Sequence, residues 1–120
     1  MVLRRLPFAV AVLFSLGSFL TPGPDLPTVT EDVWDKAGHA SIFMVLALTG
    51  VLARVRWGRL TTGLFAYASV TEILQAVLPI HRSGDWHDVL ADTVGIAVGL
   101  VIAAGLRRVA RAGAARPGGR

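Results

Sequence analysis

The sequence predicts an all-α integral membrane protein, a four-helix bundle with both termini in the cytoplasm. Of its 120 residues, 53% are hydrophobic and only 17% are charged, and the mean hydropathy is +0.60. An ordinary soluble domain of this size is less apolar. The apolar residues fall into four blocks, and the basic residues gather in the segments that four membrane crossings would place on one side.

The four apolar blocks cover residues 6–20, 37–53, 60–78 and 89–106. Each is close to the length, about 20 residues, that a helix needs to cross a bilayer core of about 30 Å. Because lipid offers no hydrogen bonds to an open backbone, we expect each block to be helical. The first block ends at a Thr-Pro-Gly-Pro segment, residues 21–24. It also has the character of a secretory signal, but it has no clear small-x-small cleavage site, so we expect it to remain as the first helix.

Basic residues set the expected orientation, because cytoplasmic segments carry an excess of Lys and Arg. Arginines precede the first block at positions 4 and 5, join the second and third at 54, 56 and 59, and follow the fourth at 107, 108, 111, 116 and 120. Four crossings place these segments on one side, which we expect to be the cytoplasm. The loops on the other side are acidic on balance. We expect residues 1–106 to form the membrane domain and residues 107–120 to form a basic, disordered cytoplasmic tail that contacts anionic lipid heads.

Composition also excludes several classes of chemistry. The chain has no cysteine, which rules out disulfides, thiolate metal sites and cysteine nucleophiles. The net charge of +4 comes from short basic clusters between apolar blocks, without a nucleic-acid-binding motif, so we expect no nucleic-acid partner. We also expect no cofactor.

Polar side chains gather near the outer ends of the last three helices. Glu72 and Asp92 each lie about 10 Å along their helices from the loop that joins them, and His39 lies about 6 Å into the second helix. Residues three, four and seven apart share one helix face. This spacing groups Asp35 and His39 with Phe43, Glu72 with Gln75, and Asp85 with Asp88 and Asp92. The last face continues as Gly95 and Gly99, a spacing that lets a neighbouring helix approach closely, so we expect it to point into the bundle.

These polar groups have two open interpretations. Ionisable groups inside a membrane are costly, and they persist when they face the protein interior, pair with one another or serve a pathway. Glu72, Asp92 and His39 therefore form either a functional pocket or an ion-paired clamp that holds four short helices together. Arg82 is a natural partner for the nearby acids, since its guanidinium binds carboxylates through two parallel bonds. A metal site of His39, Glu72, Asp88 and Asp92 is a further alternative, but no spacing resembles H-E-x-x-H and the ligands come from three helices, so we expect no bound metal.

The combination of these motifs is more informative than any one of them. The set comprises Asp35, Lys36, His39, Glu72, Gln75, Arg82, Asp85, Asp88, Asp92, Gly95 and Gly99. Across residues 35–99 this set resembles the VanZ-like family of small bacterial membrane proteins, with one departure at Asp92, where the family pattern has Asn. The resemblance implies a multi-pass protein of the bacterial cytoplasmic (inner) membrane. The family is named for a member linked to low-level resistance to the glycopeptide teicoplanin, which implies no particular reaction.

We expect the second, third and fourth helices to form a polar pocket that opens to the outer leaflet. It would bind a polar or lipid-linked cell-envelope molecule, such as a cell-wall precursor or a glycopeptide, with membrane lipid around it. Lys36 and Arg82 would meet anionic groups, and the carboxylates would meet hydroxyls or amines. One alternative is a membrane enzyme in which Glu72 or His39 acts as general base on a lipid head group. Another is a structural or assembly protein in which Gly95 and Gly99 pair two copies of the chain.

Overall fold

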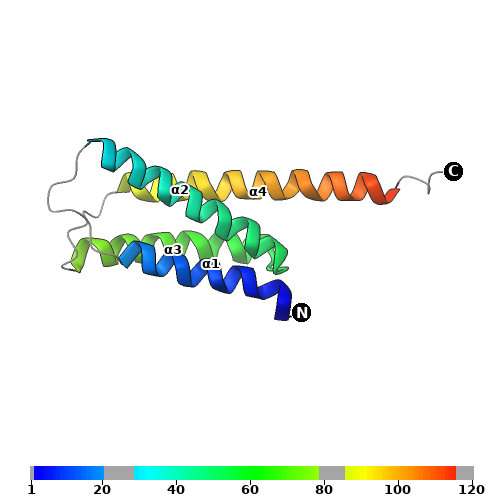
Figure 1. Cartoon of the computed structure of the whole chain (residues 1–120), viewed down its shortest axis with the longest axis horizontal. Coiled ribbons are helices and arrows are strands. Elements are labelled where there is room, and N and C mark those ends of the chain that lie inside the picture. Colours follow the sequence, from blue (N-terminus) through cyan, green and yellow to red (C-terminus); the bar gives the residue numbers. More distant parts are fainter. Residues whose placement is uncertain (1, 21–28, 79–85, 116–120) are drawn as a thin grey trace.

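The computed structural model describes residues 2–20, 29–78 and 86–115, which form four α-helices (Figure 1). These are α1 (Val2–Leu20), α2 (Val29–Leu52), α3 (Trp57–Val77) and α4 (Trp86–Ala115). The predicted all-α architecture of four helices is therefore confirmed. Two of the motif residues, Arg82 and Asp85, lie outside the described residues.

The helices extend beyond the apolar blocks that predicted them. α2 begins at Val29 instead of residue 37, and α4 continues to Ala115 instead of ending at residue 106. Hydropathy marks the apolar length of a segment, whereas helical hydrogen bonding continues until the backbone is interrupted. The prediction of a disordered tail is wrong for residues 107–115, because this stretch is rich in Ala and Arg, two strong helix formers, and the first proline after the block is Pro117.

The helices pack around a contact between α2 and α4, which cross each other in Figure 1 and share the most extensive interface of any pair. α1 packs against α2 and α3, and α3 also contacts α2 and α4. Each helix contributes to one apolar core. Buried core side chains include Phe19 from α1, Leu46 from α2, Leu64 from α3 and Ile96 from α4.

Two glycines of α4 allow its close approach to α2. A Cβ atom added at Gly95 would overlap the backbone carbonyl of Ala40, and one added at Gly99 would lie 2.7 Å from the carbonyl oxygen of Met44. Such contacts are possible only where the side chain is a hydrogen atom. The glycine face of α4 thus contacts α2 within the chain, and pairing of two copies through Gly95 and Gly99 stays a prediction.

Large apolar side chains also cover the outside of the helices. Leu13, Phe14, Ile73 and Val101 are all well exposed. By length and composition, two described helices are able to cross a membrane, Val2–Leu20 and the Trp86–Ala114 part of α4. Extensive apolar surface of this kind is typical of contact with lipid or with a partner protein.

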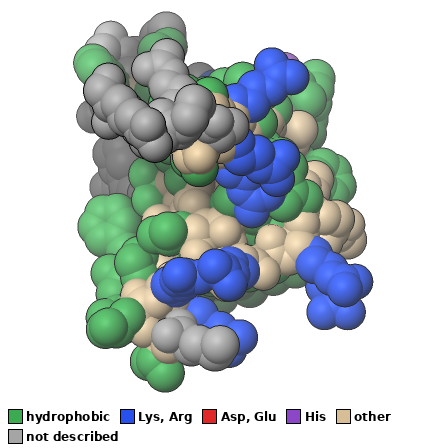
Figure 2. Space-filling view, turned by 90° about the vertical axis from the view of Figure 1, so that its right-hand side faces the viewer, with side chains coloured by type: hydrophobic (Ala, Val, Ile, Leu, Met, Phe, Trp, Pro, Cys, Tyr) green, Lys and Arg blue, Asp and Glu red, His purple; other side chains and the backbone are tan. Residues whose placement is uncertain are grey.

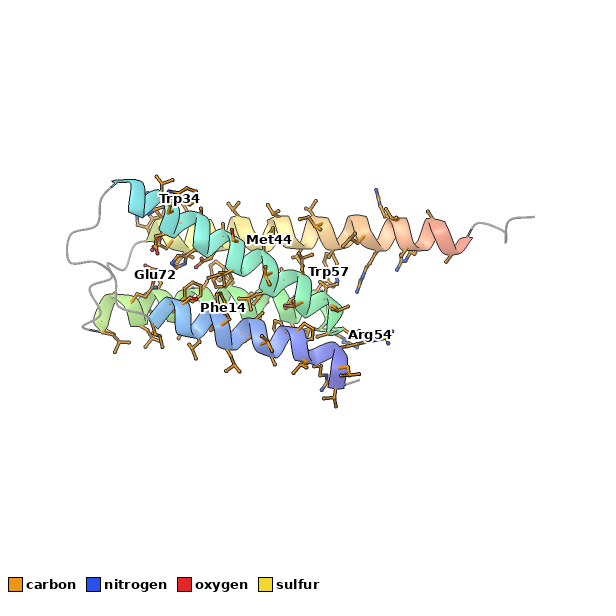
Figure 3. The ribbon with its side chains drawn as sticks, in the orientation of Figure 1. Phe14, Trp34, Met44, Arg54, Trp57 and Glu72 are labelled. Carbon is orange, nitrogen blue, oxygen red and sulfur yellow. The ribbon has the colours of Figure 1, made fainter. Side chains whose placement is uncertain are left out.

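Basic side chains gather at one end of the bundle. Figure 2 shows Lys and Arg side chains spread over the end at which α1 begins and α4 ends. A groove of about 500 Å³ at this end is lined by Arg4, Arg54 and Arg107 together with apolar side chains. Glu72 lies toward the opposite end of the bundle (Figure 3).

The glycine contact predicts an asymmetric response to two identical substitutions in α4. In Gly95→Ala, the new methyl group must displace the α2 backbone, so we expect a loss of about 1–3 kcal/mol in the free energy of unfolding. The control is Gly105→Ala, because among the described residues no atom outside the adjoining backbone of α4 lies within 4 Å of a Cβ at Gly105. We expect this control to be neutral or more stable by up to about 1 kcal/mol, since Ala favours helix more than Gly does. Denaturant unfolding in detergent measures both, and equal effects would contradict the close packing.

Candidate functional site

A buried hydrogen bond between α2 and α4 forms the centre of the candidate site. Nδ1 of His39 lies 2.8 Å from Oδ1 of Asp92. The His39 side chain is 2% exposed and that of Asp92 is 0% exposed. A charged hydrogen bond in such a dry interior is stronger than at a surface, and each partner is costly to leave alone.

Helix periodicity explains why these two side chains point inward. On α2, His39 is followed by the buried residues Phe43 and Ala47 at steps of four. On α4, Asp92 is preceded by the buried Asp88 and followed by the buried Ile96, again at steps of four. His39 and Asp92 therefore lie on the buried faces of their helices, which point toward the core.

Three more motif residues surround His39. Nε2 of His39 lies 3.7 Å from Oδ2 of Asp35, one turn earlier on α2. Nζ of Lys36 lies 3.5 Å from Oδ1 of Asp88, which joins α2 to α4 a second time. Asp88 is buried, whereas Asp35 and Lys36 are partly exposed. The structure thus brings together five of the predicted site residues, Asp35, Lys36, His39, Asp88 and Asp92.

α3 contributes a row of buried polar side chains. Thr71, Glu72 and Gln75 are buried on α3, on the face that also carries Ala68. The Gln75 side chain donates a hydrogen bond of 2.9 Å to the backbone carbonyl of Phe19 in α1. Gln75 therefore ties α3 to α1 beside the His39 cluster.

α1 contributes residues that the sequence analysis did not select. The ring of Phe19 stacks on the ring of His39, with centroids 4.7 Å apart and planes 21° apart. Ser15, one turn earlier, is buried and shares a 2.7 Å hydrogen bond with the hydroxyl group of Tyr67 in α3. The i, i+4 spacing of Ser15 and Phe19 places both on one face of α1, but within an apolar block this spacing does not distinguish a site residue from a residue of a membrane crossing.

None of the three cavities found among the described residues is lined by a residue of this cluster. One of about 300 Å³ is lined mainly by α1 and α3 residues, and one of about 250 Å³ by residues of α1 and α2. The groove of about 500 Å³ lies at the arginine-rich end. The outward-facing pocket predicted from the sequence therefore stays a prediction.

Several atoms of the cluster are chemically available. Among the described residues, Nε2 of His39, Oδ1 of Asp88 and Oδ2 of Asp92 are buried without a hydrogen bond. One ligand atom from each of Asp35, His39 and Asp88 lies within 4.8 Å of the other two. Imidazole and carboxylate groups in this arrangement can move protons, bind a cationic group or hold a metal ion.

The fold and the site define a class of protein, a small apolar four-helix bundle with a buried imidazole–carboxylate cluster at one end. The sequence model of the VanZ/LLP1 family matches residues 5–108, and the chain belongs to this family. The resemblance inferred from the motif residues is confirmed. The comparisons with curated proteins and with solved structures gave no match.

The hydrogen bond between His39 and Asp92 predicts different effects from two substitutions. His39→Ala leaves the Asp92 carboxylate buried without its partner, so we expect a loss of about 3–5 kcal/mol in unfolding free energy. Asp92→Asn keeps an oxygen that accepts the Nδ1 hydrogen, so we expect a change within about 1 kcal/mol. Thermal unfolding in detergent measures both, with His87→Ala, at an exposed position, as the control. An equally large loss in Asp92→Asn would identify the charge pair as a clamp.

Proposed function

We propose that this VanZ-family chain is an integral protein of the bacterial cytoplasmic membrane that crosses the bilayer four times. The exposed apolar side chains and the two helices of sufficient length and hydropathy support this proposal. α1 begins and α4 ends at the arginine-rich end, which is the pattern of a protein with both termini in the cytoplasm (Figure 2). The cluster around His39 then faces the outer leaflet.

This orientation predicts the location of a reporter protein fused after Arg120. We expect a fluorescent reporter that matures only in the cytoplasm to be active, and a phosphatase that requires the periplasm to be inactive. Fusions after Thr30, ahead of most of α2, should give the reverse pattern. A periplasmic signal from the fusion after Arg120 would contradict the orientation.

We also propose that the cluster binds a polar or lipid-linked molecule of the cell envelope. The supporting observation is the burial of His39, Asp88 and Asp92 in one contact between α2 and α4. Charged groups in the interior of a membrane bundle are costly, and they are typical of sites that bind or transfer a polar group. The link of the VanZ family name to teicoplanin agrees with a ligand from the cell wall, which is where glycopeptides act.

The partly exposed rim of the cluster suggests how such a molecule would be held. Lys36 is 28% exposed and offers an ammonium group to a phosphate or carboxylate. Asp35 is partly exposed beside it and can accept hydrogen bonds from hydroxyl or amine groups. The apolar surface of the helices would accommodate a lipid tail.

Binding of a lipid-linked cell-wall precursor tests this proposal. We expect Lys36→Ala to weaken binding by at least about tenfold, which corresponds to about 1.4 kcal/mol for a lost charged contact. The control is Arg108→Ala, which removes the same charge at the arginine-rich end. Lipid-nanodisc binding measurements with labelled precursor compare the two variants. Equal affinities for both variants and the wild type would remove the cluster from the proposed site.

A second candidate function is favoured by the hydrogen bond of His39. A buried carboxylate orients the imidazole through Nδ1, and Nε2 has no hydrogen bond among the described residues. This is the arrangement of a general base. The substrate would be a lipid head group. Turnover of a head group that is lost in His39→Asn and retained in His87→Asn would support the enzyme.

A further inference from the structure

The second ring nitrogen of His39 poses an electrostatic problem. With Asp92 ionised, its carboxylate only accepts hydrogen bonds, so Nδ1 of His39 carries the ring proton. In a neutral imidazole, Nε2 then presents a lone pair. Among the described residues this buried nitrogen has no hydrogen bond. Its acidic neighbour, Oδ2 of Asp35, is 3.7 Å away and also presents lone pairs.

One of these electron-rich atoms is on the buried His39 and the other is on the partly exposed Asp35, and a positive charge between them would remove their mutual repulsion. Asp88 adds to this repulsion, because one of its oxygens lies within 4.8 Å of the ligand atoms of Asp35 and His39. Asp88 is 4% exposed, and its Oδ1 has no hydrogen bond among the described residues. Asp35, Asp88 and Asp92 each carry a negative charge when ionised, and the ammonium group of Lys36 lies 3.5 Å from one of them, Asp88. The cluster therefore fits a divalent cation.

We propose that Asp35, His39 and Asp88 bind a divalent transition-metal ion. One imidazole nitrogen and two carboxylate oxygens are a donor set that suits Zn²⁺ or Mn²⁺, and the chain has no thiolate to select a softer metal. Three protein ligands leave a coordination position for water or for a ligand. Metal binding itself does not require the envelope ligand proposed above. Only the use of the open coordination position by that ligand rests on the proposed function.

Asp92 is positioned to orient His39 as a metal ligand. Histidines that bind metals usually donate their other N–H group to a carboxylate, which fixes the ring and increases its basicity. Asp92 does this for His39 at 2.8 Å, and the stacked ring of Phe19 holds the other side of the imidazole. The contact between Gly95 and Ala40, the residue after His39, fixes α4 against α2 beside the site.

Lys36 competes with the metal for Asp88. Its ammonium nitrogen lies 3.5 Å from Oδ1 of Asp88, and the side chain is partly exposed on a flexible stem. Removing this charge leaves the ligands in place and lowers the repulsion that an incoming cation meets. The metal proposal therefore expects tighter metal binding in Lys36→Gln, whereas a simple ion-pair clamp expects only a less stable protein.

The experiment uses the full chain in detergent, freed of metals with a chelator and then dialysed against Zn²⁺, Mn²⁺ or Co²⁺. Elemental analysis gives the stoichiometry, and the visible absorption of Co²⁺ reports its coordination. We expect one ion per chain. Asp35→Asn, His39→Asn and Asp88→Asn should each weaken binding by at least tenfold, and Asp92→Asn by about 10- to 100-fold. His87→Asn, at an exposed histidine, should bind as the wild type does.

Several outcomes would overturn the metal site. These are no stoichiometric binding of any of the three ions, binding that the Asp35, His39 and Asp88 variants leave unchanged, or unchanged or weaker binding in Lys36→Gln. His39 would then be an imidazolium shared between Asp35 and Asp92. Precursor binding is measured separately on metal-loaded and on metal-free protein. Precursor binding to protein that takes up no metal would overturn the metal site and leave the proposed function standing.

Discussion

The close approach of α2 and α4 is the constraint on which the rest of the structure depends. Gly95 and Gly99 allow the two backbones to meet, and this contact brings His39 within hydrogen-bond distance of Asp92. Polar groups buried in an apolar bundle need partners inside it, because burial separates them from water. The glycines and the polar pair therefore depend on each other. Small residues permit the contact, and the contact satisfies the buried imidazole and carboxylate.

α1 and α3 complete the enclosure of this contact. Phe19 covers the imidazole ring, and Gln75 fastens the backbone of α1 at the same residue. The cluster is thus assembled from four helices, none of which contains it alone. Exclusion of water strengthens every electrostatic interaction inside it and increases the penalty for any group left without a partner.

The charges of the molecule are sorted along its length. Basic side chains gather at the end where α1 begins. Asp35, Asp88 and Asp92 lie around His39, and Glu72 lies toward the end opposite the arginines (Figure 3). In a VanZ-family protein that spans a membrane, this separation gives the two surfaces different chemistry. The arginine-rich end suits anionic lipid heads. A positive partner would stabilise the carboxylates around His39, and this partner is a proton, an amine of a ligand or a metal ion.

The sequence by itself determined the four helices, the inward faces of α2 and α4 and the sorting of the arginines, because hydropathy, periodicity and charge are local properties of the chain. The predicted disorder of residues 107–115 is wrong, because the helix-forming residues of α4 continue beyond the apolar block. Only the tertiary structure decided that His39 meets Asp92 while Lys36 meets Asp88, and that Phe19 belongs to the site. Those pairings depend on how the helices rotate and cross, and a pattern within one helix carries no information about its neighbour's rotation.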